Sequence, residues 1–284
     1  MVKTHDLTLH DGRRLVVHDA GGPGGPGELV VVWHHGSPQT GALFDPLLAA
    51  AASRGIRLVG YGRPSYGGSS PNVGRDIASA AADVEQIVGA LGVDRFAVMG
   101  ASGGGPHVLA CAGLLPDRVI GAVCLASPTP WTDEFDWYAG MASPDAVRSA
   151  RGGRDARARF ALTDEFDEGQ FIDADWAALS GPWAALGRDA EQAGGAGPDG
   201  LIDDDVALVK PWGFDPGSIS VPVLLVQGGA DRVIPPSHAD RLLRTIPSAE
   251  LWLRPRDGHV SVLDACPVAM DWLLDLIERR SAAS

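Results

Sequence analysis

Continuous apolar runs recur along the first half of the chain. They lie at 29–33, 56–61, 95–100 and 119–126, and each is short. Runs of this kind, without alternation, are typical of strands buried on both faces of a parallel sheet. The segments between them have the length of helices, and in 77–92 the apolar residues recur on one helical face. Strands that alternate with helices predict an α/β fold with a parallel sheet.

Two further regions carry strand-like patterns. Residues 7–19 alternate apolar and polar side chains around an Asp-Gly turn, which predicts an antiparallel hairpin. Strand-like runs return at 221–229 and 250–254, with helices expected near 237–246 and over 267–280. The alternation of strands and helices therefore resumes after a long interruption.

The interruption, 129–216, contains no strand-like run. It offers helix starts instead, such as Ser143-Pro144-Asp145, which predicts an N-cap followed by proline at the first helical position. We expect a helical insertion over the C-terminal edge of the sheet. The chain would then have two parts, a core domain formed by 1–128 and 217–284 and a helical lid formed by 129–216.

Composition sets the interrupting segment apart. It holds 18 of the 36 acidic residues and 7 of the 23 basic ones, a net charge of −11, whereas the rest of the chain carries −2. Five of the eight tryptophans also lie there. An acidic surface with an aromatic underside suits a lid over an apolar pocket, with Trp131, Trp137 and Trp183 as candidate substrate contacts. Alternatively, these tryptophans only pack the lid onto the sheet.

The overall composition argues against several classes of protein. A net charge of −13 would repel a phosphate backbone or an anionic bilayer, so neither nucleic acid nor a membrane is an expected partner. The polar start of the chain, without a long apolar run, predicts a cytoplasmic protein. Cys111, Cys124 and Cys266 are far apart and odd in number, which argues against a disulfide framework and against a zinc site. The oligomeric state stays open.

A glycine-rich string at 21–27 contains a formal dinucleotide-binding pattern, from Gly22 to Gly27. Its prolines stiffen the segment, and a strand follows where that pattern needs a helix. We therefore interpret the string as a plain loop between strands.

The most distinctive local motif is Gly-Ala-Ser-Gly-Gly at 100–104, between a predicted buried strand and a helical stretch. A serine hydroxyl is a poor nucleophile unless it is held exposed beside a base, and a sharp strand-to-helix turn would do this for Ser102. The small neighbours tolerate the strained turn, and the positive end of the following helix favours a developing anion. An incidental serine in a glycine-rich turn is the alternative.

Two loop residues are candidates for the partners of this serine. His259 follows the last predicted strand, where a sheet of this class presents catalytic groups, and is the candidate base. Asp231 follows the strand at 221–229 and is the candidate acid that orients the imidazole. Asp257 is a rival, but two residues from His259 on the same loop it is badly placed to bond the ring.

An oxyanion would be stabilised by two backbone N–H groups. One belongs to Gly103, the residue after the candidate nucleophile, and the other to Ser37 in the loop after 29–33. Gly36 gives that loop its freedom to turn, and Ser37 has an N–H group that Pro38 lacks. A purely structural role for the loop is the alternative.

These motifs resemble the α/β-hydrolase superfamily over essentially the whole chain. The matching segments are HHGSP at 34–38, GRPSYGGSS at 62–70, GASGG at 100–104, GGADRVIP at 228–235 and DGH at 257–259. The order of the candidate nucleophile, acid and base is also that of the superfamily. The resemblance implies an eight-stranded, mostly parallel sheet with a lid inserted after the sixth strand, and it implies no cofactor.

Three departures from particular branches of the superfamily are informative. Many relatives carry Asp at the position of Gly62, so the partner of Arg63 is left open. Relatives that cleave N-terminal proline typically have an aromatic residue after the serine, and Gly103 weakens that possibility. Epoxide hydrolases and haloalkane dehalogenases have Asp as the nucleophile, so Ser102 speaks against both.

The motifs together predict a serine hydrolase that cleaves an ester or related acyl bond through a Ser-His-Asp triad and an acyl-enzyme. The substrate is expected to be small, apolar and largely neutral, because the negative charge of the lid would disfavour anions. Carbon–carbon bond hydrolysis, perhydrolysis or acyl transfer would use the same triad and stay open. A ligand-binding protein with vestigial chemistry is an alternative from another class.

Overall fold

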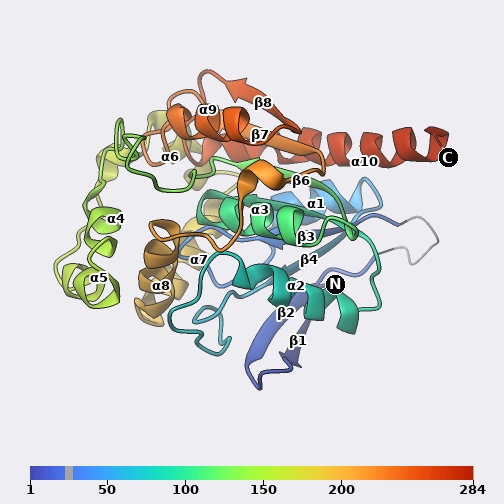
Figure 1. Ribbon diagram of the computed structural model, residues 1–284, viewed down its shortest axis with the longest axis horizontal. Coiled ribbons are helices and arrows are strands. Elements are labelled where there is room, and N and C mark those ends of the chain that lie inside the picture. The colour runs from blue at the N-terminus through green and yellow to red at the C-terminus, as the bar shows by residue number, and fades with distance from the viewer. Residues whose placement is uncertain (23–27, 284) are drawn as a thin grey trace.

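The structure, a computed structural model, describes residues 1–22 and 28–283, so the glycine-rich string at 21–27 lies largely outside the described residues. The strands are β1 (Lys3–Thr8), β2 (Arg14–Asp19), β3 (Val30–His34), β4 (Arg57–Tyr61), β5 (Phe96–Ala101), β6 (Val119–Leu125), β7 (Val223–Gly228) and β8 (Ala249–Arg254). They form one sheet in the order β1-β2-β4-β3-β5-β6-β7-β8 (Figure 1). Strand β2 runs antiparallel to β1 and β4, and the pairs from β4 to β8 are parallel. The predicted hairpin and mostly parallel sheet are confirmed.

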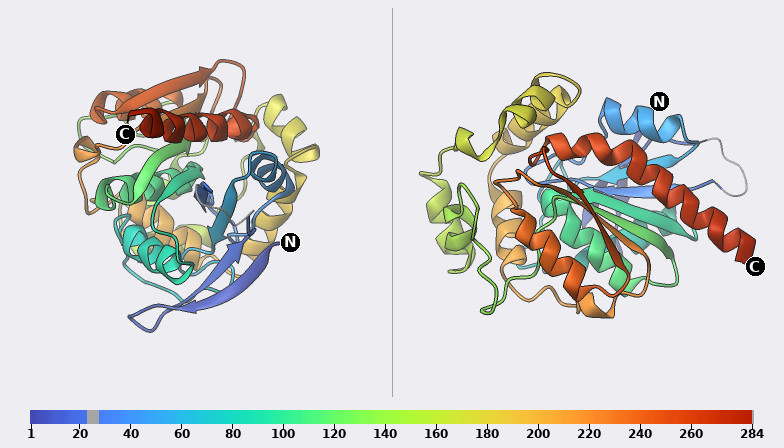
Figure 2. Two further views of the ribbon diagram at one scale, coloured as in Figure 1. Left: turned by 90° about the vertical axis from the view of Figure 1, so that its right-hand side faces the viewer. Right: turned by 90° about the horizontal axis from the view of Figure 1, so that it is seen from above.

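Helices cover both faces of the sheet because successive strand residues point to opposite sides. In β3, Val30 and Val32 pack into one apolar cluster while Val31 and Trp33 pack into the other. Helices α2 (Ser79–Ala90), α3 (Gly105–Leu114) and α9 (Pro236–Thr245) cover the first face, and α1 (Asp45–Ala52) and α10 (Cys266–Ala283) cover the second (Figure 2). Burial of one Val or Leu side chain contributes about 1.5–3 kcal/mol, so these two clusters hold the strand ends in fixed positions.

The segment 129–216, here called the insertion, connects β6 to β7. Its helices are α4 (Asp145–Ala150), α5 (Arg154–Ala161), α6 (Asp173–Ser180), α7 (Ala184–Gly195) and α8 (Asp199–Leu208). They lie across one end of the sheet (Figures 1 and 2), so the predicted helical insertion after the sixth strand is confirmed. Helix α4 begins at the predicted place, but Pro144 occupies the N-cap and no side chain caps the helix, so the predicted Ser143 cap is wrong.

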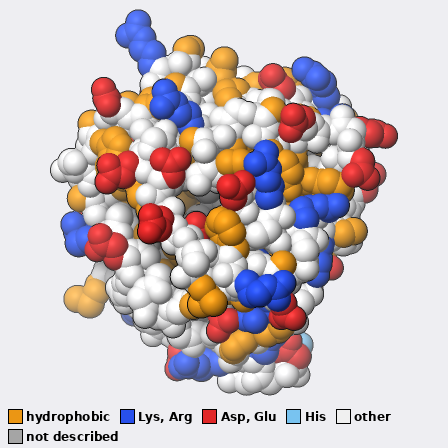
Figure 3. Space-filling view, turned by 90° about the vertical axis from the view of Figure 1, so that its left-hand side faces the viewer, with side chains coloured by type: hydrophobic (Ala, Val, Ile, Leu, Met, Phe, Trp, Pro, Cys, Tyr) orange, Lys and Arg blue, Asp and Glu red, His pale blue; other side chains and the backbone are white. Residues whose placement is uncertain are grey.

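The acidic residues of the insertion divide into two groups. Figure 3 shows its outer face, where acidic side chains are interspersed with basic and apolar ones. Five of its 18 acidic residues are buried: Asp175, Asp189, Asp203, Asp204 and Asp205. A buried carboxylate is costly unless it is paired or hydrogen-bonded, so each of these five must have partners inside the protein.

Within the described residues, no helix is long and apolar enough to cross a membrane.

Candidate active site

Four loops carry the residues singled out by the sequence motifs. They follow β3, β5, β7 and β8, and these strands run parallel within the sheet. Because parallel strands end at the same edge, the loops meet beneath the insertion. Ser37, Ser102, Asp231 and His259 lie in them, one in each loop.

Ser102 lies at a sharp turn between β5 and α3. Its φ of 52° is in the left-handed region, which is rare for a residue with a side chain and indicates backbone strain. The turn is tight enough to require glycine nearby, since a Cβ at Gly100 would lie 2.7 Å from the carbonyl oxygen of His34. The small residues predicted around the serine are thus needed for the close approach of strand, turn and helix.

A continuous chain of hydrogen bonds joins Ser102, His259 and Asp231. The distance from His259 Nε2 to Ser102 Oγ is 2.9 Å, and that from His259 Nδ1 to Asp231 Oδ2 is 2.8 Å. Asp231 is 4% exposed, and its other oxygen accepts from the backbone N–H groups of Val233 and Ile234. With the proton on Nδ1, the imidazole donates to the carboxylate while Nε2 accepts from the hydroxyl.

The environment of His259 favours its charged form. Burial alone lowers the pKa of this imidazole, but the charge and hydrogen bond of Asp231 outweigh burial, and the pKa is raised. By contrast, burial lowers the pKa of His107 to about 3 and that of His238 to about 4. The rival carboxylate Asp257 pairs with Arg254. His259 is therefore the imidazole with a raised pKa that lies within hydrogen-bonding distance of the Ser102 hydroxyl.

A carboxylate from the insertion also holds the His259 loop. Asp175, on α6, is 1% exposed and accepts from the backbone N–H groups of His259, Val260 and Ser261 at 3.2, 2.9 and 2.8 Å. It also accepts from the Ser261 hydroxyl at 2.8 Å, and its charge contributes to the raised pKa of His259. A Cβ at Gly258 would collide with this carboxylate, so the glycine of the DGH motif makes the approach possible.

The two predicted oxyanion-hole residues lie face to face. A Cβ at Gly103 would come within 2.6 Å of Ser37 Oγ and 3.8 Å of Ser37 N. Gly36 approaches the nucleophile closely as well, since a Cβ there would lie 3.5 Å from Ser102 Cβ. The structure therefore brings the backbone of 36–37 and Gly103 together beside the serine.

The partner of Arg63, left open by the sequence, comes from the insertion. Arg63 is 1% exposed, and its Nη2 lies 2.7 Å from Asp204 Oδ2 on α8. Position 62 has no room for an acidic side chain, because a Cβ at Gly62 would lie 2.7 Å from the carbonyl oxygen of Tyr66. Asp204 on α8 therefore supplies the carboxylate that pairs with Arg63, because an acidic side chain at position 62 would not fit.

The three tryptophans predicted to contact substrate are held by protein contacts. Trp137 is 1% exposed and donates its indole N–H to the carbonyl of Thr129, and Trp183 is 2% exposed and donates to Asp264. Trp131 is half-buried, and the guanidinium of Arg151 stacks on its ring. Contact with substrate stays a prediction for all three.

Sequence reasoning did not single out Asp175 or Asp204. A signal for Asp204 was present, since three consecutive aspartates in α8 are flanked by Ile202 on one side and Val206 on the other. Charges embedded in an apolar helical run require partners inside the protein. For Asp175 the flanking sequence gave no comparable signal.

Comparisons with known proteins agree with this fold. A sequence profile of the alpha/beta hydrolase fold family matches residues 30–265. The chain is 28% identical over 252 residues to a non-heme chloroperoxidase of Streptomyces lividans. This match covers 82% of this chain and 84% of the chloroperoxidase. It is 26% identical over 265 residues to a 2-hydroxy-6-oxo-6-phenylhexa-2,4-dienoate hydrolase of Burkholderia cepacia, with coverage of 87% and 85%.

Solved structures are similar over nearly their whole length. A thermophilic esterase from Thermogutta terrifontis matches with a TM-score of 0.72 and 19% identity, over 96% of this chain and 99% of that chain. An enol-lactonase from Burkholderia xenovorans LB400 matches with a TM-score of 0.70 and 19% identity, over 96% and 100%. At such identities these structures establish the fold alone.

Proposed function

The chain belongs to the α/β-hydrolase family, and on that premise we propose that it is a serine hydrolase with Ser102, His259 and Asp231 as its catalytic triad. The observation that carries the proposal is the unbroken hydrogen-bond chain from carboxylate through imidazole to hydroxyl, at 2.8 and 2.9 Å. Each of these bonds is short enough for proton transfer or for orientation of the ring without rearrangement.

The first half of the proposed reaction forms an acyl-enzyme. Ser102 Oγ attacks the carbonyl carbon of an ester while its proton passes to His259 Nε2. The imidazolium that results is stabilised by Asp231, in keeping with the raised pKa of His259. The carbonyl oxygen becomes an oxyanion, for which the backbone N–H groups of Ser37 and Gly103 are the donors. The proton then moves from Nε2 to the leaving alcohol, and the ester bond breaks.

The second half of the reaction releases the acid. A water molecule takes the place of the alcohol, and His259 accepts its proton as it attacks the acyl carbon. The same two N–H groups stabilise the second oxyanion. Breakdown of this intermediate returns the proton to Ser102 Oγ and regenerates the free hydroxyl.

The insertion is proposed to act as a lid over a small, largely apolar acyl substrate, with the remainder of the chain as the core domain. This proposal is supported by the position of α6, α7 and α8, which lie across one end of the sheet (Figures 1 and 2). Ser102 follows β5 at that end. Trp131 is the most accessible of the three predicted substrate contacts, because Trp137 and Trp183 are fully buried.

A second candidate reaction is hydrolysis of a carbon–carbon bond beside a ketone. It is favoured by the two curated relatives named as hydrolases of 2-hydroxy-6-oxo dienoates, from Burkholderia cepacia and Comamonas testosteroni. Perhydrolysis and acyl transfer would use the same triad. Perhydrolysis is considered because two other relatives are named as non-heme chloroperoxidases.

Fluorophosphonate labelling tests the triad directly. The wild-type protein should be labelled, and Ser102→Ala should not, because the probe reacts with an activated serine hydroxyl. Ser143→Ala, an exposed serine of the insertion, is the matched control and should be labelled like wild type. An unlabelled wild type, or equal labelling of Ser102→Ala, would refute the assignment.

A substrate panel separates the two reactions. We expect p-nitrophenyl esters of short fatty acids to be turned over faster than vinylogous diketones, with lactones, thioesters and amides as further members. A strong preference for diketones would replace the ester assignment by the carbon–carbon one while leaving the triad in place.

A further inference from the structure

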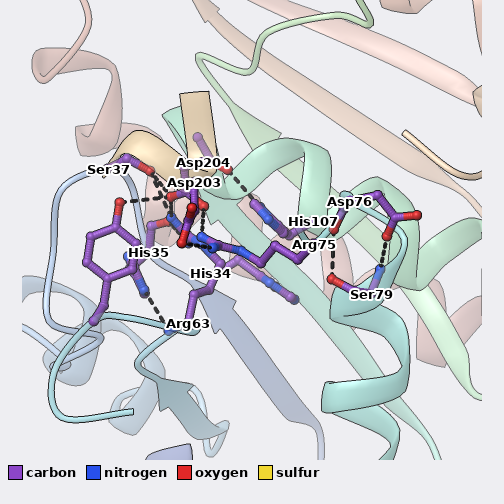
Figure 4. A network of polar contacts seen from close by, with 12 residues as sticks. His34, His35, Ser37, Arg63, Arg75, Asp76, Ser79, His107, Asp203 and Asp204 are labelled. Carbon is purple, nitrogen blue, oxygen red and sulfur yellow. Dashed lines mark hydrogen bonds and ion pairs between the residues drawn. The ribbon is translucent and has the colours of Figure 1, made fainter. Parts of the chain in front are cut away.

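A buried polar cluster connects insertion helix α8 to the loop that carries Ser37 (Figure 4). At its centre is Asp204, which is 0% exposed. One of its oxygens accepts from Ser37 Oγ at 2.5 Å, Arg63 Nη2 at 2.7 Å and Tyr66 OH at 3.0 Å. The other accepts from Arg75 Nη2 at 2.5 Å. Three segments of the core, at 37, 63–66 and 75, therefore meet on one carboxylate of α8.

Arg63, which is paired with Asp204, also binds the oxyanion loop, defined here as residues 35–38. The guanidinium donates to the carbonyl oxygen of His35, to that of Gly36 at 3.4 Å and to Ser37 Oγ at 2.8 Å. The Ser37 hydroxyl thus accepts from Arg63 and donates its proton to Asp204, so two hydrogen bonds set its orientation. Three successive residues are fixed by one ion pair.

The cluster is built from paired charges. Arg63 and Arg75 face Asp204, and Arg75 also lies 3.5 Å from Asp203. These two positive and two negative side chains, each at most 2% exposed, balance one another, and Asp203 also lies 2.9 Å from the partly exposed Arg154. Breaking such a buried pair leaves an uncompensated charge that would pull the loop toward another partner or toward water.

We propose that Asp204 is a positioning residue for the oxyanion hole, holding the N–H group of Ser37 opposite Gly103 directly and through Arg63. This inference rests on the proposed function, because it presumes that Ser37 and Gly103 receive the oxyanion. Its consequence is that the insertion completes the catalytic centre as well as covering it. The hydrogen bonds of Asp204 go to Ser37, Arg63, Tyr66 and Arg75 and not to Ser102, so in this proposal it acts through the loop.

A second carboxylate of the insertion supports the same role. Asp189, on α7, accepts from Thr40 N at 2.8 Å and from Thr40 Oγ1 at 2.5 Å, a few residues beyond Ser37. The chain from 35 to 40 is therefore bonded by two separate insertion helices. A displacement of about 1 Å at a catalytic donor is enough to lower a rate substantially, so these bonds bear on turnover as well as on folding.

The test compares Asp204→Asn with Asp205→Asn. Both variants remove one negative charge from a buried aspartate of α8, but Asp205 pairs with Arg157 within the insertion and does not touch the oxyanion loop. The readouts are the second-order rate constant of fluorophosphonate labelling at Ser102, and kcat and KM for p-nitrophenyl butyrate. Assays are run at about pH 8, where both wild-type carboxyl groups are ionised.

We expect Asp204→Asn to lower the labelling rate constant and kcat by about 10- to 100-fold, with KM changed by less than about three-fold. Asp205→Asn should stay within about three-fold of wild type in all three quantities. Ser37→Ala should lower kcat by about three- to ten-fold, and adding Asp204→Asn to it should cost less than in the wild-type background, since part of the effect of Asp204 passes through the Ser37 hydroxyl.

The outcomes separate two kinds of failure. If the wild type is not labelled, the proposed function is wrong and this inference falls with it. If the wild type is labelled and Asp204→Asn matches Asp205→Asn, or its effect is fully additive with that of Ser37→Ala, the inference alone is overturned. Should Asp204→Asn fail to fold, Ser37→Ala decides, and a kcat equal to that of wild type overturns the inference.

Discussion

Replacing Asp175 by asparagine should both destabilise the protein and shift its pH dependence. Asp175 Oδ1 accepts from Val260 N, Ser261 N and Ser261 Oγ, while Oδ2 accepts from His259 N and Ile172 N. Asparagine can keep the first oxygen but puts an NH₂ group opposite the last two N–H donors. Two accepted bonds are lost, and two half-buried donors are left without this acceptor.

The size of the effect on stability follows from those two bonds. Each hydrogen bond to a charged acceptor contributes roughly 1.5–3 kcal/mol, so Asp175→Asn should lower the free energy of unfolding by about 3 kcal/mol or more. For a chain of this size, about 3 kcal/mol corresponds to a fall in Tm of roughly 6–12 °C. Asp173→Asn, on the same helix but exposed, removes the same charge and should lower Tm by no more than about 2 °C.

The effect on pH dependence has a definite sign. Burial lowers the pKa of His259, but Asp231 and, to a smaller extent, Asp175 raise it above its ordinary value. Since the base must be neutral, kcat/KM falls as the pH drops through this raised pKa. Asp175→Asn removes one of the charges that favour the imidazolium, so the acid limb should move to lower pH. Asp173→Asn should leave the limb unchanged.

The same shift in the pKa of His259 should also appear in the pH dependence of stability. A raised pKa in the folded protein stabilises it at pH values below the unfolded pKa, and this contribution is lost as the pH rises through the folded pKa. Asp175→Asn should therefore cost more stability near pH 5 than near pH 9, values that lie roughly on either side of the imidazole titration. A shift of the acid limb to higher pH, or equal Tm losses for Asp175→Asn and Asp173→Asn, would refute the reasoning.

Three further predictions concern the proposed triad, the oxyanion hole and the insertion. Asp231→Asn should lower kcat by about 10³-fold or more because the imidazole loses its orienting carboxylate, whereas Asp257→Asn should keep wild-type kcat; equal losses would contradict the choice of acid. Gly103→Ala should lower kcat by about ten-fold or more in the same assay, since its methyl group meets Ser37 Oγ. Trp183→Phe should lower the stability measured by urea unfolding by about 1–3 kcal/mol, because a smaller ring replaces the buried indole and the hydrogen bond to Asp264 is lost.

Much of the fold could be predicted from the sequence because its signals are local. Buried parallel strands are continuous apolar runs, and the helix over 77–92 has its apolar residues on one face, so burial is visible in the pattern. The same holds for the turn at Ser102, whose small neighbours are required by the left-handed φ and by contacts such as that of Gly100 with His34. Most boundaries differ by one to three residues, as for α2, which begins at Ser79, whereas the hairpin begins at Lys3, four residues before its predicted start.

The contacts between the insertion and the core could not be predicted in this way. Arg63 and Asp204 are 141 residues apart in sequence, and nothing near either residue identifies the other. Asp175 lies close in sequence to Phe171, Ile172 and Trp176, yet its carboxylate accepts hydrogen bonds from the backbone of 259–261. Long-range polar pairing depends on how the insertion docks, which periodicity does not specify.

Burial also changes what the charge of the insertion implies for the substrate. The net charge of −11 was the reason to expect that anions are disfavoured, but several of the carboxylates closest to the site are neutralised in pairs. Asp203 and Asp204 pair with Arg63 and Arg75, which the core supplies. The exposed carboxylates lie on the outer face, and fields of exposed charges are screened over roughly 8–10 Å at physiological salt. For the proposed substrate, selection against anions is therefore expected to depend on the groups nearest Ser102, because the exposed charges of the insertion act there only weakly.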